Sequence, residues 1–351
     1  MAEISTTDAR ALFTKMLIDV YQERIRPTAF LRSFFPTVTA PTKEISIEVE
    51  RMGEKVAVDV VRGTEGNRNT FSKSTEKIFI PPIYREYFDA TQLDLYDRVL
   101  GSQGNAQVPL FTALLQSVAD RMSLLQDKIE RAYEIQAAQV LETGKVLLQS
   151  ATDIDFKRKA ASMVDKGAGA YWATGTVDPF ADLAAGADFL RKVGRSPDAL
   201  YNVIIGSTAL ADLLTNTKFL ARQNLFNMAL DSVQGPARGA AGMTFNGTVT
   251  GGAYKFQLWG YPQFYDDANG VSQPYWNPKK IAIVPLNPRF KLAFAAVPQL
   301  IGEPGQMPVQ GAYKVGEFID QRKAVHDFDI QSAGVAIPIA VDTIYTLQVV
   351  A

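Results

Sequence analysis

Few residues in this chain have the types and spacing that catalysis needs. The single histidine, His326, stands in Lys-Ala-Val-His-Asp-Phe-Asp, where a neighbouring carboxylate could make it a general base. A lone His in a terminal strand is more often structural, and one His cannot build a multi-His metal site. The chain has no cysteine, which excludes disulfides, zinc fingers, thiol catalysis and iron–sulfur clusters. We therefore predict no catalytic and no metal-binding residue.

Three other motifs resemble functional loops only in part. Asp266-Asp267-Ala268-Asn269-Gly270 lacks the alternating ligands and the closing Glu of a calcium loop, which favours a polar hairpin tip. The Gly-rich stretch 234–253 contains neither GxGxxG after a strand nor GxxxxGK[ST], and it reads as a flexible loop. Ser207 follows Gly206 without a GxSxG elbow, so we interpret it as the N-cap of a helix over Ser207–Asn216. The sequence thus predicts no cofactor-binding residue.

Composition limits the classes of partner. The chain has 351 residues, of which 47% are hydrophobic and 21% charged, enough for two or three substructures with a real core. Lys and Arg number 36 against 37 Asp and Glu, so the excess of positive charge typical of tight nucleic-acid binding is missing. No apolar run reaches the ~18 residues of a membrane span, and the first residues lack the pattern of a signal peptide. We expect synthesis and folding in a cytoplasm, without membrane contact.

A long polar ribbon is predicted at 43–91. Apolar residues alternate with Glu and Ser over residues 45–50, and Val56, Val58 and Val60 alternate again after a turn at Met52-Gly53, which is the period of a strand with one polar face. Residues 62–77 hold one aromatic and no aliphatic side chain and should form an exposed tip. Because a two-stranded arm is only marginally stable alone, we expect another surface to support it.

One very long helix is predicted over 109–143, starting at Pro109 and stopping before Gly144. Its length would be about 52 Å at 1.5 Å per residue. A coiled coil is the obvious alternative, but we favour a single spine helix backed by sheet, because polar and small residues interrupt the apolar stripe and strands follow. The stripe that should face the core is Phe111, Leu114, Leu115, Val118, Met122, Leu125, Ile129, Ala132, Gln136 and Val140.

The other segments alternate irregularly between helix and strand, which indicates an α+β protein rather than a doubly wound sheet. Phe30-Leu31-Arg32-Ser33-Phe34-Phe35-Pro36 reads as a hydrophobic plug into the subunit's own core, with an arm docking on a neighbour as the alternative. The predicted helices are 7–26, Phe156–Lys166, Pro179–Val193 and Ser207–Asn216. The predicted strands are 201–206, Tyr254–Leu258, Tyr261–Tyr265, Lys280–Val284, Asp327–Ile330, Ala333–Ile339 and Thr343–Val349.

Taken in order, these pieces resemble the major capsid proteins of tailed double-stranded DNA bacteriophages, in particular the lambda-like major capsid protein E family. The resemblance covers most of the chain and is closest at Phe30–Pro36, in the helix around Asp127–Ala138, and at Ile330-Gln331-Ser332-Ala333 with the terminal strands. It implies the HK-97-like capsid fold. The layout that it implies is an N-terminal arm (1–42), an extended loop (43–91), a peripheral domain (92–195) with the spine helix 109–143, an axial domain (196–290), and a return to the peripheral domain (291–351).

The resemblance also implies a function. Copies of the chain would self-assemble as hexamers and pentamers into an icosahedral shell around a phage genome, with the extended loop lying across a neighbour. Scaffold, portal and decoration proteins would be partners, contact with packaged DNA would be weak and non-specific, and the virion capsid would assemble in the cytoplasm of a host bacterium. An encapsulin-like compartment that houses a cargo enzyme is the alternative with the same fold. An enzyme of unknown class would rest on His326 and the Asp266–Asp267 pair alone.

Overall fold

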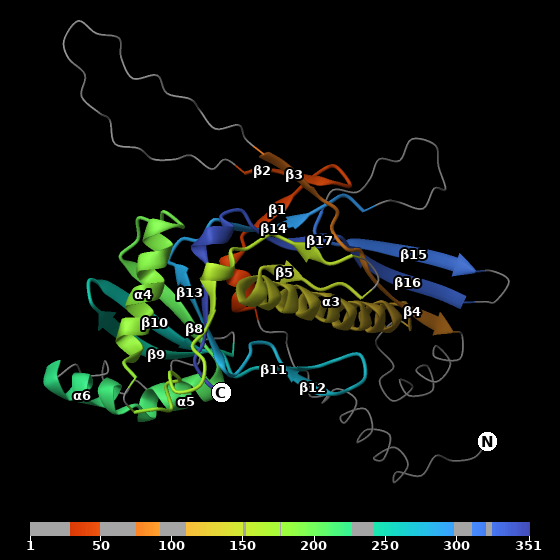
Figure 1. Cartoon of the computed structure of the whole chain (residues 1–351). Coiled ribbons are helices and arrows are strands. Elements are labelled where there is room, and N and C mark those ends of the chain that lie inside the picture. Colours follow the sequence, from red (N-terminus) through yellow and green to blue (C-terminus); the bar gives the residue numbers. More distant parts are fainter. Residues whose placement is uncertain are drawn as a thin grey trace, which may run out of the picture.

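The computed structural model describes residues 29–49, 75–91, 110–149, 152–175, 177–226, 242–297, 311–320 and 325–351. Figure 1 shows an α+β molecule in which one long helix lies beside several small sheets and a larger sheet carries the shorter helices. The α+β class predicted from the sequence is confirmed. The predicted helix at 7–26 and most of the predicted ribbon tip at 62–77 lie outside the described residues.

A six-stranded mixed sheet organises one half of the molecule. Its two central strands are short, mostly apolar and buried at every position after the first, as expected for strands covered on two sides. Parallel pairs join β8 with β10 and β18 with β7, and the other neighbours are antiparallel. In spatial order the strands are β7 (Met163–Asp165), β18 (Tyr345–Gln348), β13 (Lys280–Pro285), β8 (Leu200–Ile205), β10 (Tyr254–Gly260) and β9 (Thr244–Gly251).

Helices cover one face of this sheet and build the first core. α4 (Pro179–Lys192) packs across β9, β10, β13 and β18, with α5 (Ser207–Thr215) and α6 (Thr217–Phe226) beside it. Asp178 caps α4 by accepting the N–H of Phe180, and Pro179 at the first helical position fits the same start signal. Side chains from alternate strand positions, including Val203, Ile283 and Leu347, point into this core.

The opposite face of the same sheet belongs to the second core. Ile204, Ala282 and Val284 point to this side, where they join the long helix α3 (Leu110–Thr143) and the 3-10 helix η1 (Leu31–Phe34). A three-stranded sheet closes this core, with Leu292 of β14 and Ala336 of β17 facing each other in register. Its order is β1 (Thr37–Thr39), β14 (Phe290–Phe294) and β17 (Gly334–Pro338).

Four smaller sheets lie around α3. The three-stranded one packs beside the helix, where Tyr84 of β4 meets Tyr133 of α3 edge to face. Two-residue strands β5 and β6 follow directly after α3. These sheets are β15 (Lys314–Asp320), β16 (Val325–Ser332) and β4 (Tyr84–Thr91); β2 (Ile45–Val49) with β3 (Thr75–Phe79); β5 (Lys145–Val146) with β6 (Ile154–Asp155); and β11 (Phe264–Asp266) with β12 (Ser272–Pro274).

Several sequence-based predictions of elements are confirmed. α3 matches the predicted spine helix, α4 and α5 match two predicted helices, and strands occur in each of the three terminal segments. β2 pairs antiparallel with β3, with Ile45 opposite Phe79 and Val49 opposite Thr75, which confirms a ribbon at its base. Asp267 accepts the N–H groups of Asn269 and Val271 at the tip of the β11–β12 hairpin, as a polar turn should.

Other predictions were wrong. Residues 156–166 form no α-helix; they hold the turn η2 (Ala160–Ser162) and β7, because Lys157 takes a positive φ of 55° and Arg158 turns inward. Residues 244–251 of the Gly-rich stretch form strand β9, which pairs with β10, and residues 234–241 lie outside the described part of the chain. Strand β11 starts at Phe264 rather than Tyr261, and α6 was not foreseen.

The predicted cap of α5 was also wrong. The N-cap is Gly206, and no side chain caps this helix end. A Cβ on Gly206 would collide with the backbone of Asn277 and Pro278, so the close approach of that loop explains the glycine.

Candidate assembly surface

The C-terminal half of α3 is buried on nearly all sides. Sheet β14–β17 and strand β16 contact it, as do η1 and strand β5. Ile129, Gln136 and Val140 of the predicted stripe are buried, but so are Tyr133 and Leu141, which the stripe omitted. A single amphipathic face therefore does not describe the C-terminal half of the spine helix.

Glu134 on α3 is a fully buried carboxylate that binds two distant segments. Its Oε1 accepts the N–H of Leu31 and the hydroxyl of Tyr261, both at 2.8 Å, and its Oε2 accepts the N–H of Arg32 at 3.0 Å. Burial raises the pKa of Glu134, and the hydrogen bonds from these groups oppose that rise. The carboxylate thus joins η1 and the segment after β10 to the helix.

The aromatic segment at 30–36 packs into the subunit's own core. Phe30 and Phe35 are buried, and Leu31 is completely enclosed. Phe30 contacts the rings of Trp259 and Tyr261 at centroid distances of 5.8 and 5.4 Å. The interpretation as a hydrophobic plug is confirmed for these residues.

The C-terminal end of α3 is tied to the six-stranded sheet by a buried arginine. Arg158 Nη1 donates to the carbonyl of Leu141 at 3.0 Å, and Nη2 donates to the carbonyl of Ile344 and to Thr346 Oγ1 at 3.0 and 2.8 Å. A cation at a helix C-terminus satisfies the last carbonyls and interacts favourably with the helix dipole. Burial lowers the pKa of Arg158 to about 9.

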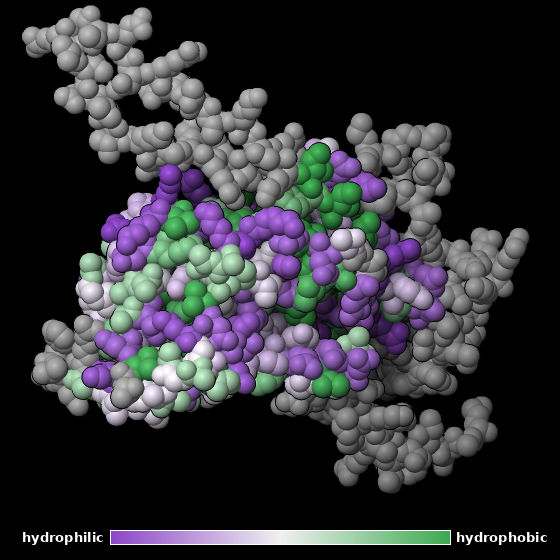
Figure 2. Space-filling model, viewed as in Figure 1, coloured by the Kyte–Doolittle hydropathy of each residue, from purple (hydrophilic) through white to green (hydrophobic). Residues whose placement is uncertain are grey.

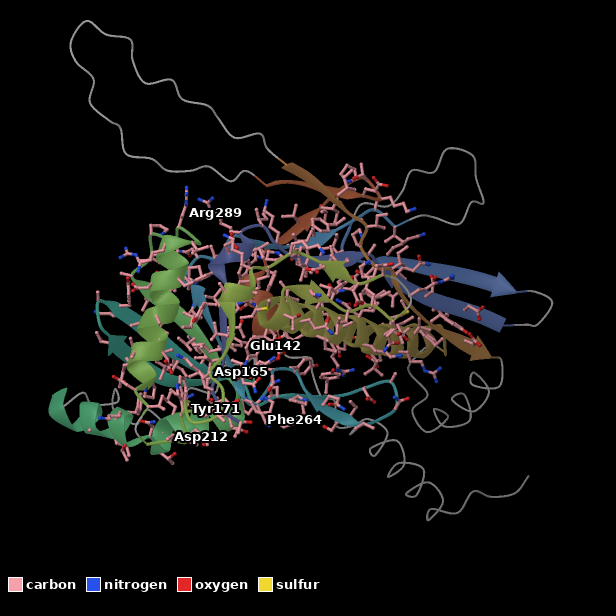
Figure 3. The ribbon with its side chains drawn as sticks, viewed as in Figure 1. Glu142, Asp165, Tyr171, Asp212, Phe264 and Arg289 are labelled. Carbon is pink, nitrogen blue, oxygen red and sulfur yellow. The ribbon has the colours of Figure 1, made fainter. Side chains whose placement is uncertain are left out.

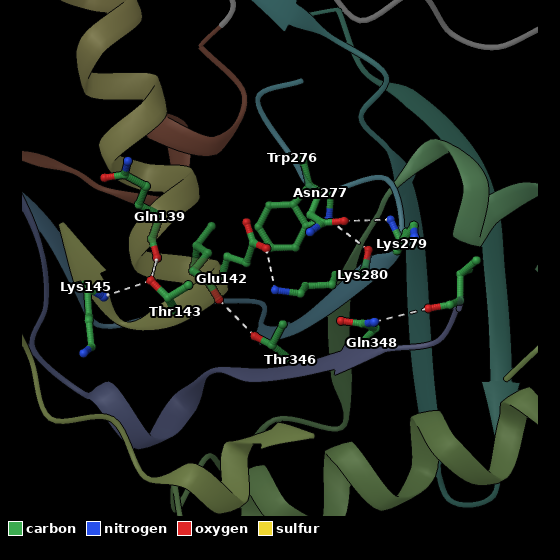
Figure 4. Close-up of polar contacts among 12 residues, drawn as sticks. Gln139, Glu142, Thr143, Lys145, Trp276, Asn277, Lys279, Lys280, Thr346 and Gln348 are labelled. Atoms are coloured by element: carbon green, nitrogen blue, oxygen red, sulfur yellow. Dashed lines mark hydrogen bonds and ion pairs between the residues drawn. The ribbon is translucent and has the colours of Figure 1, made fainter. Parts of the chain in front are cut away.

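A second connection runs beside this arginine. Lys280 Nζ of β13 donates to Glu142 Oε1 of α3 at 2.7 Å, and Thr346 Oγ1 of β18 donates to the carbonyl of Leu141 at 3.0 Å (Figure 4). The helix end and the sheet are therefore held together by charged and neutral hydrogen bonds.

Residues 78–83, at the base of the predicted ribbon and called the ribbon root below, include an exposed apolar surface. Phe79 of β3 turns inward onto Phe156 at a centroid distance of 5.1 Å, whereas Ile78 and Ile80 on either side of it are 60% and 57% exposed. Ile83, just after Pro81-Pro82, is exposed as well. Figure 2 shows apolar surface around this root. Contiguous exposed apolar side chains of this kind mark interaction sites.

The β11–β12 hairpin is a second exposed surface. Tyr265 anchors it by contacting Tyr275 at a centroid distance of 4.9 Å, but Phe264 and Val271 are 60% and 53% exposed. In Figure 3 Phe264 lies on the side of α3 opposite the ribbon root of Figure 1. Tyr87 on β4 and Val315 on β15 are further exposed apolar side chains.

The few residues considered for catalysis do not form one site. His326 lies in β16 opposite Ile319 and Ala90, whereas Asp266 and Asp267 lie on the β11–β12 hairpin. Within the described ranges, no group of three or more His, Asp or Glu side chains is placed to hold a metal ion. No helix in that same part of the chain is long and apolar enough to cross a membrane.

Sequence reasoning missed the two buried charges that join the elements. Glu134 is not part of the apolar stripe predicted to face the core, and Arg158 lies inside the wrongly predicted helix 156–166. A signal for Glu134 was available, because it falls between the buried positions Tyr133 and Ala137 in a segment where apolar residues occur on every side. Arg158 had no such local signal, since its acceptors come from segments up to 188 positions away.

Comparison with known families gives a match over nearly the whole chain. The model of the family described as phage major capsid protein E matches residues 14–349. No curated protein matches significantly.

Solved structures share the fold at low sequence identity. The chain is similar to a prophage capsid protein of Escherichia coli CFT073, described as putative, with a TM-score of 0.57, 16% identity and full coverage of both chains. It is also similar to the mature capsid of bacteriophage PhiM1, with a TM-score of 0.51, 10% identity and coverage of 93% and 89%. A phage-related protein of Bordetella bronchiseptica RB50 gives a TM-score of 0.50 at 11% identity, covering 93% of each chain. These structures indicate an HK-97-like capsid fold.

Proposed function

The chain belongs to the phage major capsid protein E family and is a phage capsid subunit, and we propose that its copies close into an icosahedral shell of hexamers and pentamers around a double-stranded DNA genome. The observation that carries this proposal is the ribbon root. Two five-residue strands leave the subunit as an isolated pair and expose Ile78, Ile80 and Ile83 at their base. A neighbouring copy would cover these side chains and support the ribbon.

The proposed layout keeps the predicted segments. Residues 1–42 would be the N-terminal arm, 43–91 the extended loop, 92–195 the peripheral domain, 196–290 the axial domain and 291–351 the return. The sheet supports a wider axial unit, because β7 and β18 from outside 196–290 pair into the sheet of β8 and β13.

The proposed role is structural rather than enzymatic. Capsid function needs no reacting groups, and the candidate catalytic residues lie in separate elements. Scaffold, portal and decoration proteins are proposed partners. We also propose weak, non-specific contact with packaged DNA, because a formal charge of −1 is more compatible with weak than with tight DNA binding. Assembly would take place in the cytoplasm of a host bacterium. The family match favours a phage shell over an encapsulin-like compartment.

Removing the distal ribbon tests the proposal. Because Val49 pairs with Thr75, an Asn-Gly turn can replace residues 50–74 and close β2 onto β3 as a hairpin. We expect a folded subunit, with wild-type circular dichroism, that forms no shells in negative-stain microscopy. A second variant carrying an equally long Gly/Ser segment controls for length and should fail in the same way. Normal shells from either variant would contradict a shell held together by this loop, and absence of shells from the wild-type chain would contradict the function itself.

A further inference from the structure

Strand β13 has oppositely charged segments at its two ends. The β11–β12 hairpin precedes β13, and the turn into β14 follows it, so the two segments leave the sheet at opposite ends of the strand. Figure 3 shows this separation, with Phe264 and Arg289 on opposite sides of the molecule.

The hairpin combines acidic and apolar side chains. Residues 264–274, which form the hairpin, contain Asp266 and Asp267 and no Lys or Arg; the exposed Lys279 follows just before β13. Phe264 and Val271 are more than half exposed beside these carboxylates. Residues 268–273 are all exposed, as are Phe264 and Asp266, so most of the hairpin surface is available to another molecule.

The β13–β14 turn has the complementary chemistry. The turn and the start of β14 (residues 286–291) contain Arg289 in the turn and Lys291 in the strand, and no Asp or Glu. Leu286 in this turn is 43% exposed, and both cations are exposed. The turn itself is held in place, because the carbonyl of Arg289 accepts the N–H of Ile339 at 3.0 Å.

None of these four charges joins an ion pair within the part of the chain that the structure describes. Other exposed apolar pairs lack this complementarity. Leu214 and Leu220 on α5 and α6, for example, are accompanied by both Asp212 and Lys218. Charge therefore distinguishes the hairpin and the turn from this pair on α5 and α6.

We propose that the β11–β12 hairpin of one copy docks on the β13–β14 turn of a second copy, with Phe264 against Leu286 and Asp266 and Asp267 facing Arg289 and Lys291. A contact between two different patches on opposite sides of the subunit is heterologous. It repeats from copy to copy and closes only as a ring or shell. Complementary charge would select the register and suppress wrong pairings. This inference rests on the proposed self-assembly and names one of its contacts.

Charge reversal with reciprocal rescue tests the contact. The acidic side is changed by Asp266→Lys with Asp267→Asn, since Asn keeps the oxygen that accepts the turn N–H groups. The basic side is changed by Arg289→Glu with Lys291→Glu. We expect each double variant to give at least about tenfold fewer particles by sedimentation and microscopy, and the quadruple variant to regain most of the yield. Combining the acidic-side change with Lys218→Glu and Lys279→Glu should give no recovery.

Particles at wild-type yield from either double variant would overturn the contact, as would a quadruple variant no better than the doubles. Those results leave the proposed function intact, because the wild-type chain would still form shells. If a double variant proves unfolded by circular dichroism, a variant that carries both Asp266→Cys and Arg289→Cys provides the second measurement, since the natural chain has no cysteine. A bifunctional maleimide should then link copies into a ladder that neither single variant gives, and monomer alone would overturn the proposal.

Discussion

The carboxylate of Glu134 accepts the backbone N–H of Leu31 at 2.8 Å, although the two residues are 103 positions apart. This bond fixes the start of η1 on the middle of α3. Since the same oxygen also accepts the hydroxyl of Tyr261, one side chain determines how the N-terminal segment and the six-stranded sheet meet the long helix.

Removing this carboxylate should destabilise the subunit strongly. Glu134→Ala leaves two backbone N–H groups and a tyrosine hydroxyl buried without an acceptor, which should lower the free energy of unfolding by about 3 kcal/mol or more. Urea unfolding of the unassembled subunit measures the change. Glu130→Ala, one turn earlier in a partly exposed ion pair with Arg32, is the matched control and should cost under about 1 kcal/mol. Equal losses would refute the special role of Glu134.

The pH dependence of stability should carry a component from Glu134. Its pKa is raised in the folded state by burial, so the folded protein binds this proton more tightly than the unfolded chain does. The associated stabilisation is complete below the ordinary Glu pKa and is lost as pH rises through the raised value. Glu134→Gln does not titrate, so the wild-type free energy of unfolding should fall relative to that of the variant as pH rises above the ordinary Glu pKa and through the raised one. A difference independent of pH would contradict this prediction.

Arg158 should not be replaceable by lysine. Its planar guanidinium reaches Ser162, Leu141, Ile344 and Thr346 at once, and an ammonium group cannot satisfy these dispersed acceptors together. We expect Arg158→Lys to lower the free energy of unfolding by about 2–4 kcal/mol. Lys280→Met, which removes a less buried partner of the same helix end, provides the comparison and should cost less. A larger loss for Lys280→Met would show that the ion pair, not the arginine, holds the helix.

The sequence predicted Ser207 as the N-cap of α5, whereas the structure has Gly206 in that position. Gly206→Ala would push a Cβ into the backbone of Asn277 and Pro278, where relief requires a main-chain shift, and should cost about 3 kcal/mol. Ser207→Ala removes no capping hydrogen bond and should change stability by less than about 0.5 kcal/mol. Thermal unfolding of both variants decides the matter, and the reverse ranking would restore Ser207 as the cap.

The sequence predicted best those elements that follow from local rules. Pro109 and Gly144 bounded the long helix, and Gly144 indeed takes a φ of 70° just after it. Alternation predicted the base of the ribbon, and the resemblance of the ordered segments to a capsid family gave the fold.

Errors arose where distant contacts decide the local conformation. Residues 156–166 have helical composition, yet Arg158 finds its acceptors on α3 and β18, and residues 163–165 pair with β18. The Gly-rich stretch contains strand β9 because β10 supplies its partner. The exposed surfaces could not be foreseen either, because alternation at Ile78-Phe79-Ile80 does not say which face meets Phe156.

The six-stranded sheet has a mechanical consequence for the particle. One face contributes side chains to each core, so neither core can shift relative to the other without disturbing side chains of that sheet. In the proposed shell, pressure from the enclosed genome would therefore be transmitted through α4, the sheet and α3 as one connected unit. In the proposed shell, a change in size or curvature would then be absorbed at the joints between subunits, where we place the ribbon and the hairpin.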